Sequence, residues 1–168
     1  MRAGIALGSN VGDRLANLRE AWREVMALAG VHPPFACSSV YETEPIGPGA
    51  GEEPFLNAVA EVDYEGHPVS LLDALQGIEA RMGRPSKRPR NAPRAIDLDI
   101  LYAGNLVLAN DEICIPHPRL HLRRFVLAPL GEIRPQLVLP GQERAIADLL
   151  AGLREPGEAR VYPGTLNG

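Results

Sequence analysis

The chain has 168 residues, of which 45% are hydrophobic and 23% charged, as in an ordinary globular protein. Its net charge of −4 argues against a general nucleic-acid or membrane binder, and no stretch approaches the ~20 apolar residues that span a bilayer. Cys37 and Cys114 form no CxxC pair, so we expect neither a zinc site nor a disulfide scaffold, and a reducing, cytoplasmic location is the default. We expect a single domain over residues 1–168 and a monomer.

The first third of the chain predicts strands around one helix. Apolar side chains recur at helical spacing before Gly30, and the Pro33-Pro34 pair that follows cannot continue a helix. A stretch with three prolines and three glycines must be a loop. The predicted elements are a strand at 3–7, a helix at 13–29, a strand at 35–41, the loop at 44–54 and a strand at 56–62.

The rest of the chain predicts a second helix, a fourth strand and several additions. Pro68 suits the first turn of that helix. The predicted elements are a helix at 69–82, a loop at 83–93, a strand at 96–102, short strands at 106–108 and 113–115, and helices at 122–130 and 145–153. The core order βαββαβ is the ferredoxin-like arrangement, an α+β fold in which helices pack on an antiparallel sheet, here with C-terminal additions.

The tripeptide Asp97-Leu98-Asp99 is the strongest local signal for chemistry. Because side chains alternate along a strand, both aspartates point to one face while Leu98 points to the core. Two such carboxylates, about 6.6 Å apart along the strand, suit a cation between them, and Mg²⁺ prefers oxygen ligands completed by phosphates and water. The alternative is an exposed strand face on which both acids are merely solvated.

A cationic loop precedes these acids. Six of the chain's 17 lysines and arginines lie within residues 81–94, and no acid lies among them. Arginine forks clamp phosphate oxygens, and a metal ion bridges phosphates to carboxylates, so the layout suits a polyphosphate with its metal. A solvated charge run or a nucleic-acid contact is the alternative.

Three further residues are candidates for binding. His117 lies between two prolines, which hold it in a rigid turn where it could contact a phosphate or simply face solvent. Phe55 and Phe125 each follow a polar, irregular stretch. They could sandwich a flat heteroaromatic substrate, or they could be core residues.

The run over residues 90–101, Arg-Asn-Ala-Pro-Arg-Ala-Ile-Asp-Leu-Asp-Ile-Leu, closely resembles the signature of the 6-hydroxymethyl-7,8-dihydropterin pyrophosphokinase family. Residues 6–10, 38–57 and 115–130 resemble the family in the same order, so that the likeness covers roughly residues 3–140. The resemblance implies transfer of diphosphate from ATP to the pterin, with AMP as the other product, in folate biosynthesis.

The resemblance also implies site residues. Two Mg²⁺ ions would bind Asp97 and Asp99, and catalysis would depend on these two with Arg84, Arg94 and His117. ATP, the co-substrate, would contact Gln76, Glu79, Arg84, Lys87, Arg90, Arg94, Ile100, His117 and Arg123. The pterin would contact Thr43, Pro45, Ile46, Phe55, Asn57, Asp97 and Phe125.

Two other classes of function remain open from the residues alone. A nucleotidyl- or phosphotransferase with a different acceptor would share the acids and the cationic loop. A ferredoxin-like binding module with an anion pocket would bind ATP without turnover. The small molecules ATP and pterin are the expected partners, with no nucleic acid and no membrane.

Overall fold

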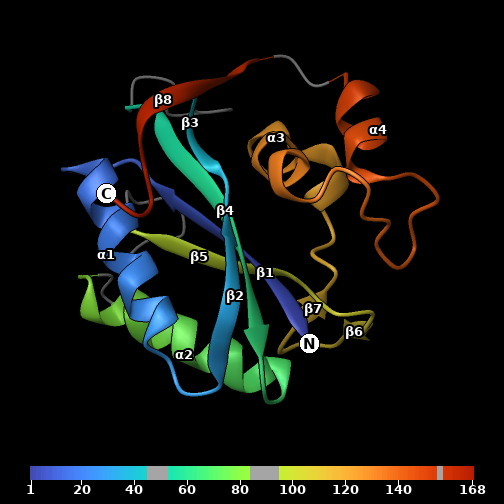
Figure 1. The fold of residues 1–168 in the computed structure, drawn as a ribbon, viewed down its shortest axis with the longest axis horizontal. Helices are drawn as coiled ribbons and strands as arrows, with labels where there is room; N and C mark the ends of the chain where they lie inside the picture. Colours follow the sequence, from blue (N-terminus) through green and yellow to red (C-terminus); the bar gives the residue numbers. More distant parts are fainter. Residues whose placement is uncertain (45–52, 84–94, 155–156) are drawn as a thin grey trace.

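The computed structural model describes residues 1–44, 53–83, 95–154 and 157–168. Among them, six strands form one antiparallel sheet in the order β5-β1-β4-β3-β8, with β2 paired to β4 (Figure 1). These strands are β1 (Arg2–Ser9), β2 (Val31–Cys37), β3 (Ser39–Thr43), β4 (Phe55–Tyr64), β5 (Asp97–Ala103) and β8 (Ala159–Thr165). The short strands β6 (Leu108–Ala109) and β7 (Cys114–Ile115) pair with each other.

Helices cover both faces of this sheet (Figure 1). On one face lie α1 (Arg14–Met26), which Asp13 caps, and α2 (Pro68–Arg81), which has its proline in the first turn. On the other lie the 3-10 turn η1 (Leu120–Leu122), α3 (Arg124–Ile133) and α4 (Ile146–Ala151). Within the described ranges, no helix is long and apolar enough to cross a membrane.

The central strand β4 is buried on both faces, which is why seven of its ten residues are apolar. Leu56 and Val62 pack with α1 and α2, whereas Val59 packs with α3. The predicted alternation over residues 56–62 therefore describes only one of the two cores.

The prediction of one strand over residues 35–41 is wrong, because the structure has β2 and β3 with a break at Ser38. At this break the Ser38 backbone N–H donates to the Val59 carbonyl, and the Val59 N–H donates to the Ser38 hydroxyl, both at 2.9 Å. The Pro33-Pro34 pair lies inside β2, where the register with β4 shifts, so the missing N–H groups do not disturb a regular ladder. Strand β8 was not predicted at all.

Gly4 lets Tyr102 of β5 cross over β1. Gly4 pairs with both Tyr102 and Glu61, and a Cβ built on it would lie 2.4 Å from Cε1 of the tyrosine ring. Through this gap the Tyr102 hydroxyl donates to the Glu61 carboxylate. Gly4 is therefore needed because a side chain there would overlap the Tyr102 ring and disturb this hydrogen bond.

We expect Gly4→Ala to lower the free energy of unfolding by about 1–3 kcal/mol, because the buried ring must move away from the added methyl group. Urea denaturation measures the effect. Gly131→Ala is the matched control, since a Cβ there meets nothing closer than 3.7 Å and alanine favours the helix. Equal stability of the two variants would contradict the steric role of Gly4.

Candidate active site

A cavity of about 550 Å³ opens over one end of the sheet, between the strands, α2 and the start of α3. It brings together nine of the predicted site residues from five elements or their immediate ends. The cavity is lined by Ala6, Leu7, Gly8, Thr43, Glu44, Phe55, Asn57, Ala58, Leu72, Gln76, Glu79, Asp97, Leu98, Asp99, Arg123 and Phe125.

Gly8 forms the open floor of this cavity. It pairs with Asp97 on one side and with Asn57 on the other, so these side chains point to the same face of the sheet. A Cβ on Gly8 would lie 3.0 Å from the Asn57 Oδ1 atom. The missing side chain therefore leaves room between the carboxylate and the amide.

Asp97 and Asp99 both line the cavity from β5, with Asp99 the more exposed. The residues that alternate with them, Leu98 and Ile100, are buried in the core on the other face. This is the alternation that the sequence predicts. The two carboxylates are thus offered to a ligand without disturbing the core.

Glu79 fixes the backbone between the two aspartates. It is 6% exposed, and its Oε2 atom accepts the Leu98 backbone N–H at 3.0 Å. Among the described strands, β5 lies at the end of the sheet order, and α2 supplies an acceptor for this N–H through the Glu79 carboxylate. Glu79 also lines the cavity, as does Gln76 from the same helix.

His117 is held beside β5 but lines a separate cavity of about 150 Å³. Its backbone N–H donates to the Leu101 carbonyl at 2.8 Å, and its Nδ1 atom accepts the Arg119 N–H at 3.2 Å. Burial lowers the pKa of His117, the charges of Arg123 and Arg119 lower it further, and Asp99 opposes this. With Nδ1 accepting, the neutral ring bears its proton on Nε2, where it can donate to an anion.

The predicted pterin residues converge from three elements. Thr43 on β3, Phe55 and Asn57 on β4 and Phe125 on α3 all line the large cavity. The Asn57 Nδ2 atom donates to the Thr43 hydroxyl at 2.7 Å, and both residues are buried. This bond orients the Asn57 amide over Gly8.

The predicted ATP side and the predicted pterin side of the cavity meet at the start of α3. The Arg123 guanidinium carbon, expected on the ATP side, lies 5.4 Å from the centre of the Phe125 ring, expected on the pterin side. One arginine therefore contacts the aromatic ring and faces the same cavity, which is a cation–π arrangement.

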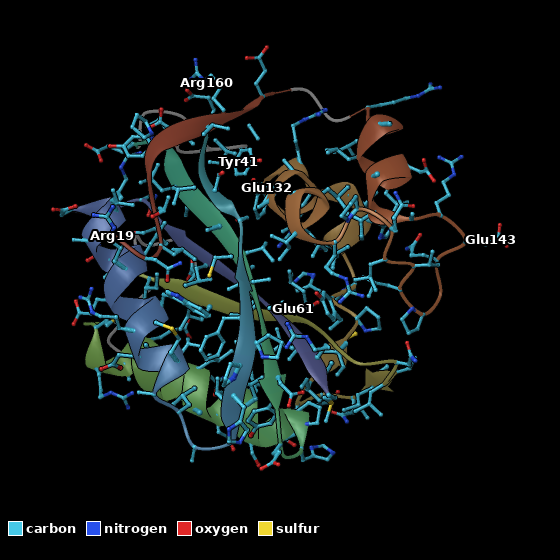
Figure 2. The ribbon with its side chains drawn as sticks, in the orientation of Figure 1. Arg19, Tyr41, Glu61, Glu132, Glu143 and Arg160 are labelled. Carbon is cyan, nitrogen blue, oxygen red and sulfur yellow. The ribbon has the colours of Figure 1, made fainter. Side chains whose placement is uncertain are left out.

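A carboxylate ties α3 to the sheet. Glu132 accepts the backbone N–H and the hydroxyl of Ser39 at 2.9 and 2.8 Å, and the Tyr41 hydroxyl at 2.7 Å. Figure 2 shows Glu132 and Tyr41 facing each other between α3 and β3. This contact helps to set where Phe125, near the start of the helix, meets the cavity.

The described lining of this cavity does not include the remaining predicted residues. The Ile100 side chain lies in the core, 5% exposed, so only its backbone could approach a ligand. Six others lie outside the described residues: Pro45, Ile46, Arg84, Lys87, Arg90 and Arg94. Conversely, sequence reasoning missed Gly8, Glu44 and Leu72 as lining residues; only Gly8, at the end of an apolar run, gave a local signal.

Asp97 and Asp99 suit a hard cation only if phosphate oxygens and waters complete its coordination shell. Among the described residues, His, Cys, Asp and Glu side chains form no group of three or more that could hold a metal ion. Two carboxylates at an open cavity suit Mg²⁺, which retains waters and shares its shell with substrate phosphates. The residues present therefore fit a metal ion that arrives with a polyphosphate.

The comparisons with known proteins agree on one family. Its model, described as 7,8-dihydro-6-hydroxymethylpterin-pyrophosphokinase, matches residues 4–135. Enzymes named 2-amino-4-hydroxy-6-hydroxymethyldihydropteridine pyrophosphokinase are similar: that of Haemophilus influenzae is 41% identical, covering 84% of this chain and 86% of its own, and that of Methylorubrum extorquens is 38% identical, covering 95% and 98%.

A solved structure with a similar fold is that of Plasmodium falciparum HPPK-DHPS wild type with pteroate. It has a TM-score of 0.70 at 15% identity, and the match covers 89% of this chain. The chain spans only 42% of that longer protein. At this identity the likeness concerns the fold alone.

Proposed function

The chain belongs to the 7,8-dihydro-6-hydroxymethylpterin-pyrophosphokinase family, and we propose that the cavity over β1, β4 and β5 is where it transfers diphosphate from ATP to 6-hydroxymethyl-7,8-dihydropterin. One observation supports this most: the Asp97 carboxylate lies across Gly8 from the buried Asn57 amide, and Asp99 lines the same cavity two residues further along β5. Such a cavity can hold a metal-bound polyphosphate beside a flat polar ring.

The reaction is an in-line displacement. The hydroxyl oxygen of the pterin forms a bond to the β-phosphorus of ATP, the bond from that phosphorus to the oxygen of AMP breaks, and the hydroxyl proton is released. Positioning and charge neutralisation provide most of the acceleration in reactions of this kind. The protein must therefore align both substrates and stabilise the charge on the transferred group.

Asp97 and Asp99 would hold two Mg²⁺ ions. When bound, these ions neutralise phosphate charge and orient the reacting oxygens. Glu79 keeps the two carboxylates aligned through the Leu98 N–H. His117 can donate from Nε2 to a phosphate oxygen, and Arg123 faces the cavity as a cation.

The remaining ATP contacts are proposed from the family. They are Gln76 from the cavity wall, the backbone at Ile100, and Arg84, Lys87, Arg90 and Arg94 outside the described residues.

The pterin would lie between Phe55, Phe125 and Asn57. The two aromatic rings offer apolar surface to a flat heterocycle, and the Asn57 amide both donates and accepts, which suits the amide-like edge of the ring. Thr43 supports that amide by accepting one of its N–H groups. Pro45 and Ile46, outside the described residues, are proposed to complete this side.

We propose further that the fold is the ferredoxin-like βαββαβ arrangement. The antiparallel order β5-β1-β4-β3 supports this, because it places the fourth, first, third and second core strands side by side. We also propose one domain over residues 1–168, a monomer and a cytoplasmic location. The free cysteines Cys37 and Cys114 are consistent with a reducing compartment.

One assay tests the proposed function. The protein is incubated with ATP, Mg²⁺ and 6-hydroxymethyl-7,8-dihydropterin, and the nucleotide product is identified. We expect AMP, formed only when the pterin is present. Release of pyrophosphate would indicate a nucleotidyltransferase, and binding of ATP with no product would indicate a binding module.

We expect Asn57→Ala and Phe125→Ala to weaken pterin binding about tenfold or more while ATP binding changes little. Asn57 supplies directional hydrogen bonds to a polar edge and Phe125 supplies stacking area, and losing either corresponds to roughly 1–2 kcal/mol. Calorimetric titration of each ligand measures this. Normal pterin binding in both variants would return Phe125 to the role of a core residue and reopen the identity of the acceptor.

A further inference from the structure

Arg14, the first residue of α1, joins the two chain segments on either side of residues 45–52. Its Nη1 atom donates to the Glu42 carboxylate on β3 at 2.9 Å and to the Pro54 carbonyl before β4 at 2.6 Å. Its side chain is only 16% exposed. A charged donor that is shielded from water makes stronger hydrogen bonds than one on the open surface.

These two partners lie next to residues of the cavity wall. Thr43 follows Glu42 in the sequence and Phe55 follows Pro54. Thr43 and Phe55 pair with each other across β3 and β4. Both line the cavity, and Thr43 accepts the amide of Asn57. Arg14 therefore fixes, from the start of α1, the strand ends that present the acceptor side.

The C-terminal strand β8 shields this arginine. The Arg14 guanidinium carbon lies 5.5 Å from the centre of the Tyr162 ring. β8 pairs with β3 next to the same wall, with Thr43 opposite Ala159, and Arg160 lies 3.4 Å from Glu44, which itself lines the cavity (Figure 2 labels Arg160 on this strand). This strand lies beyond residues 4–135, the part that the family model matches.

The far end of β8 is fastened to α1 separately. Arg19 donates from Nε to the Thr165 carbonyl at 2.8 Å. Gly164, at φ +124°, packs so closely that a Cβ would lie 2.7 Å from Leu15. Arg14 and Arg19 thus both link α1 to β8, but of the two only Arg14 reaches the strand ends that border the cavity.

We propose that Arg14 is a positioning residue for the acceptor side of the cavity and that Tyr162 of β8 supports it. The guanidinium holds the ends of β3 and β4 at one spacing, which keeps Thr43, Phe55 and Asn57 aligned for the flat ring. This rests on the proposed function, which assigns that side to the pterin. Strand β8 then contributes to the geometry of the site through Tyr162.

The test compares Arg14→Ala, Arg14→Lys and Tyr162→Leu with Arg19→Ala, the matched control on the same helix and strand. The dissociation constant of the pterin is measured by calorimetry with a non-hydrolysable ATP analogue at saturation, that of the analogue is measured alone, and Tm is recorded for each variant. We expect Arg14→Ala to raise the pterin Kd about tenfold or more, as for one lost charge-assisted contact. We expect its analogue Kd to stay within about twofold and its Tm to fall no further than that of Arg19→Ala.

Arg14→Lys should fall between Arg14→Ala and the wild type, because an ammonium group keeps the charge but lacks the planar guanidinium that lies over the Tyr162 ring. Tyr162→Leu should also raise the pterin Kd while leaving the analogue Kd unchanged, by a smaller factor than Arg14→Ala. If Arg14→Ala does not fold, Tyr162→Leu tests the proposal in its place. Unchanged pterin binding in Arg14→Ala, or a parallel loss of pterin and analogue binding in that variant, would overturn the positioning role. A wild-type protein that binds no pterin would instead overturn the proposed function.

Discussion

Replacing Asp97 or Asp99 with alanine is expected to slow diphosphate transfer by about a thousandfold or more, which corresponds to roughly 4 kcal/mol of lost transition-state stabilisation. Both side chains line the cavity and neither belongs to the core, so the protein should stay folded. The turnover rate with saturating ATP, Mg²⁺ and pterin measures the loss, and thermal unfolding checks the fold.

Asp111→Ala is the matched control, because this aspartate is exposed in the turn between β6 and β7, away from the cavity. It should leave the rate unchanged. Titrating Mg²⁺ against ATP binding adds an independent measurement, since each cavity variant should require more Mg²⁺. Near-normal turnover in either cavity variant would remove Asp97 and Asp99 as the metal site.

Local periodicity accounts for the elements that could be predicted from sequence. Helices α1 and α2 each bury one stripe of side chains, which leaves a clear 3.6-residue spacing. The alternation at Asp97 and Asp99 is equally local, because the start of β5 has one buried face and one face open to the cavity. Such patterns depend on neighbours within a few residues.

Contacts between distant segments account for what could not be predicted. Strand β8 contains Pro163 and Gly164 and is largely exposed, and it pairs with a strand more than a hundred residues earlier. The cap at Leu98 comes from Glu79 on another element, and the fixed amide of Asn57 depends on Thr43 across the ladder. None of these contacts leaves a periodic trace in the sequence.

Glu61 is a buried charge that can be recognised in the sequence. It is a charged residue in the middle of the apolar run of β4, and it is 2% exposed. A buried carboxylate needs partners, and it has three: Arg2 at 2.9 Å, Arg134 at 2.8 Å and the Tyr102 hydroxyl. An acid within an apolar strand therefore predicts a buried polar cluster, although not the identity of its partners.

We expect Glu61→Ala to lower the free energy of unfolding by about 2–4 kcal/mol at neutral pH. The change leaves the Tyr102 hydroxyl buried without its acceptor and deprives Arg2 and Arg134 of their shared carboxylate; each arginine side chain is about one third exposed, so water compensates part of the loss. Arg134 follows α3, so this contact also holds that helix on the sheet. Urea denaturation measures the loss.

The same cluster makes stability depend on pH. Burial raises the pKa of Glu61, but hydrogen bonds from Tyr102, Arg2 and Arg134, with the Arg134 charge, outweigh it and leave the pKa below the ordinary 4.5. The unfolded chain therefore binds the proton more readily, and the stabilisation is present above pH 4.5 and lost as the pH falls through the lower, folded pKa. The fall in the free energy of unfolding at acid pH, the acid limb of the stability curve, should be less steep in Glu61→Gln. Glu112→Gln, at an exposed turn, should leave this limb unchanged. An acid limb as steep in Glu61→Gln as in the wild type would show that other carboxylates cause it.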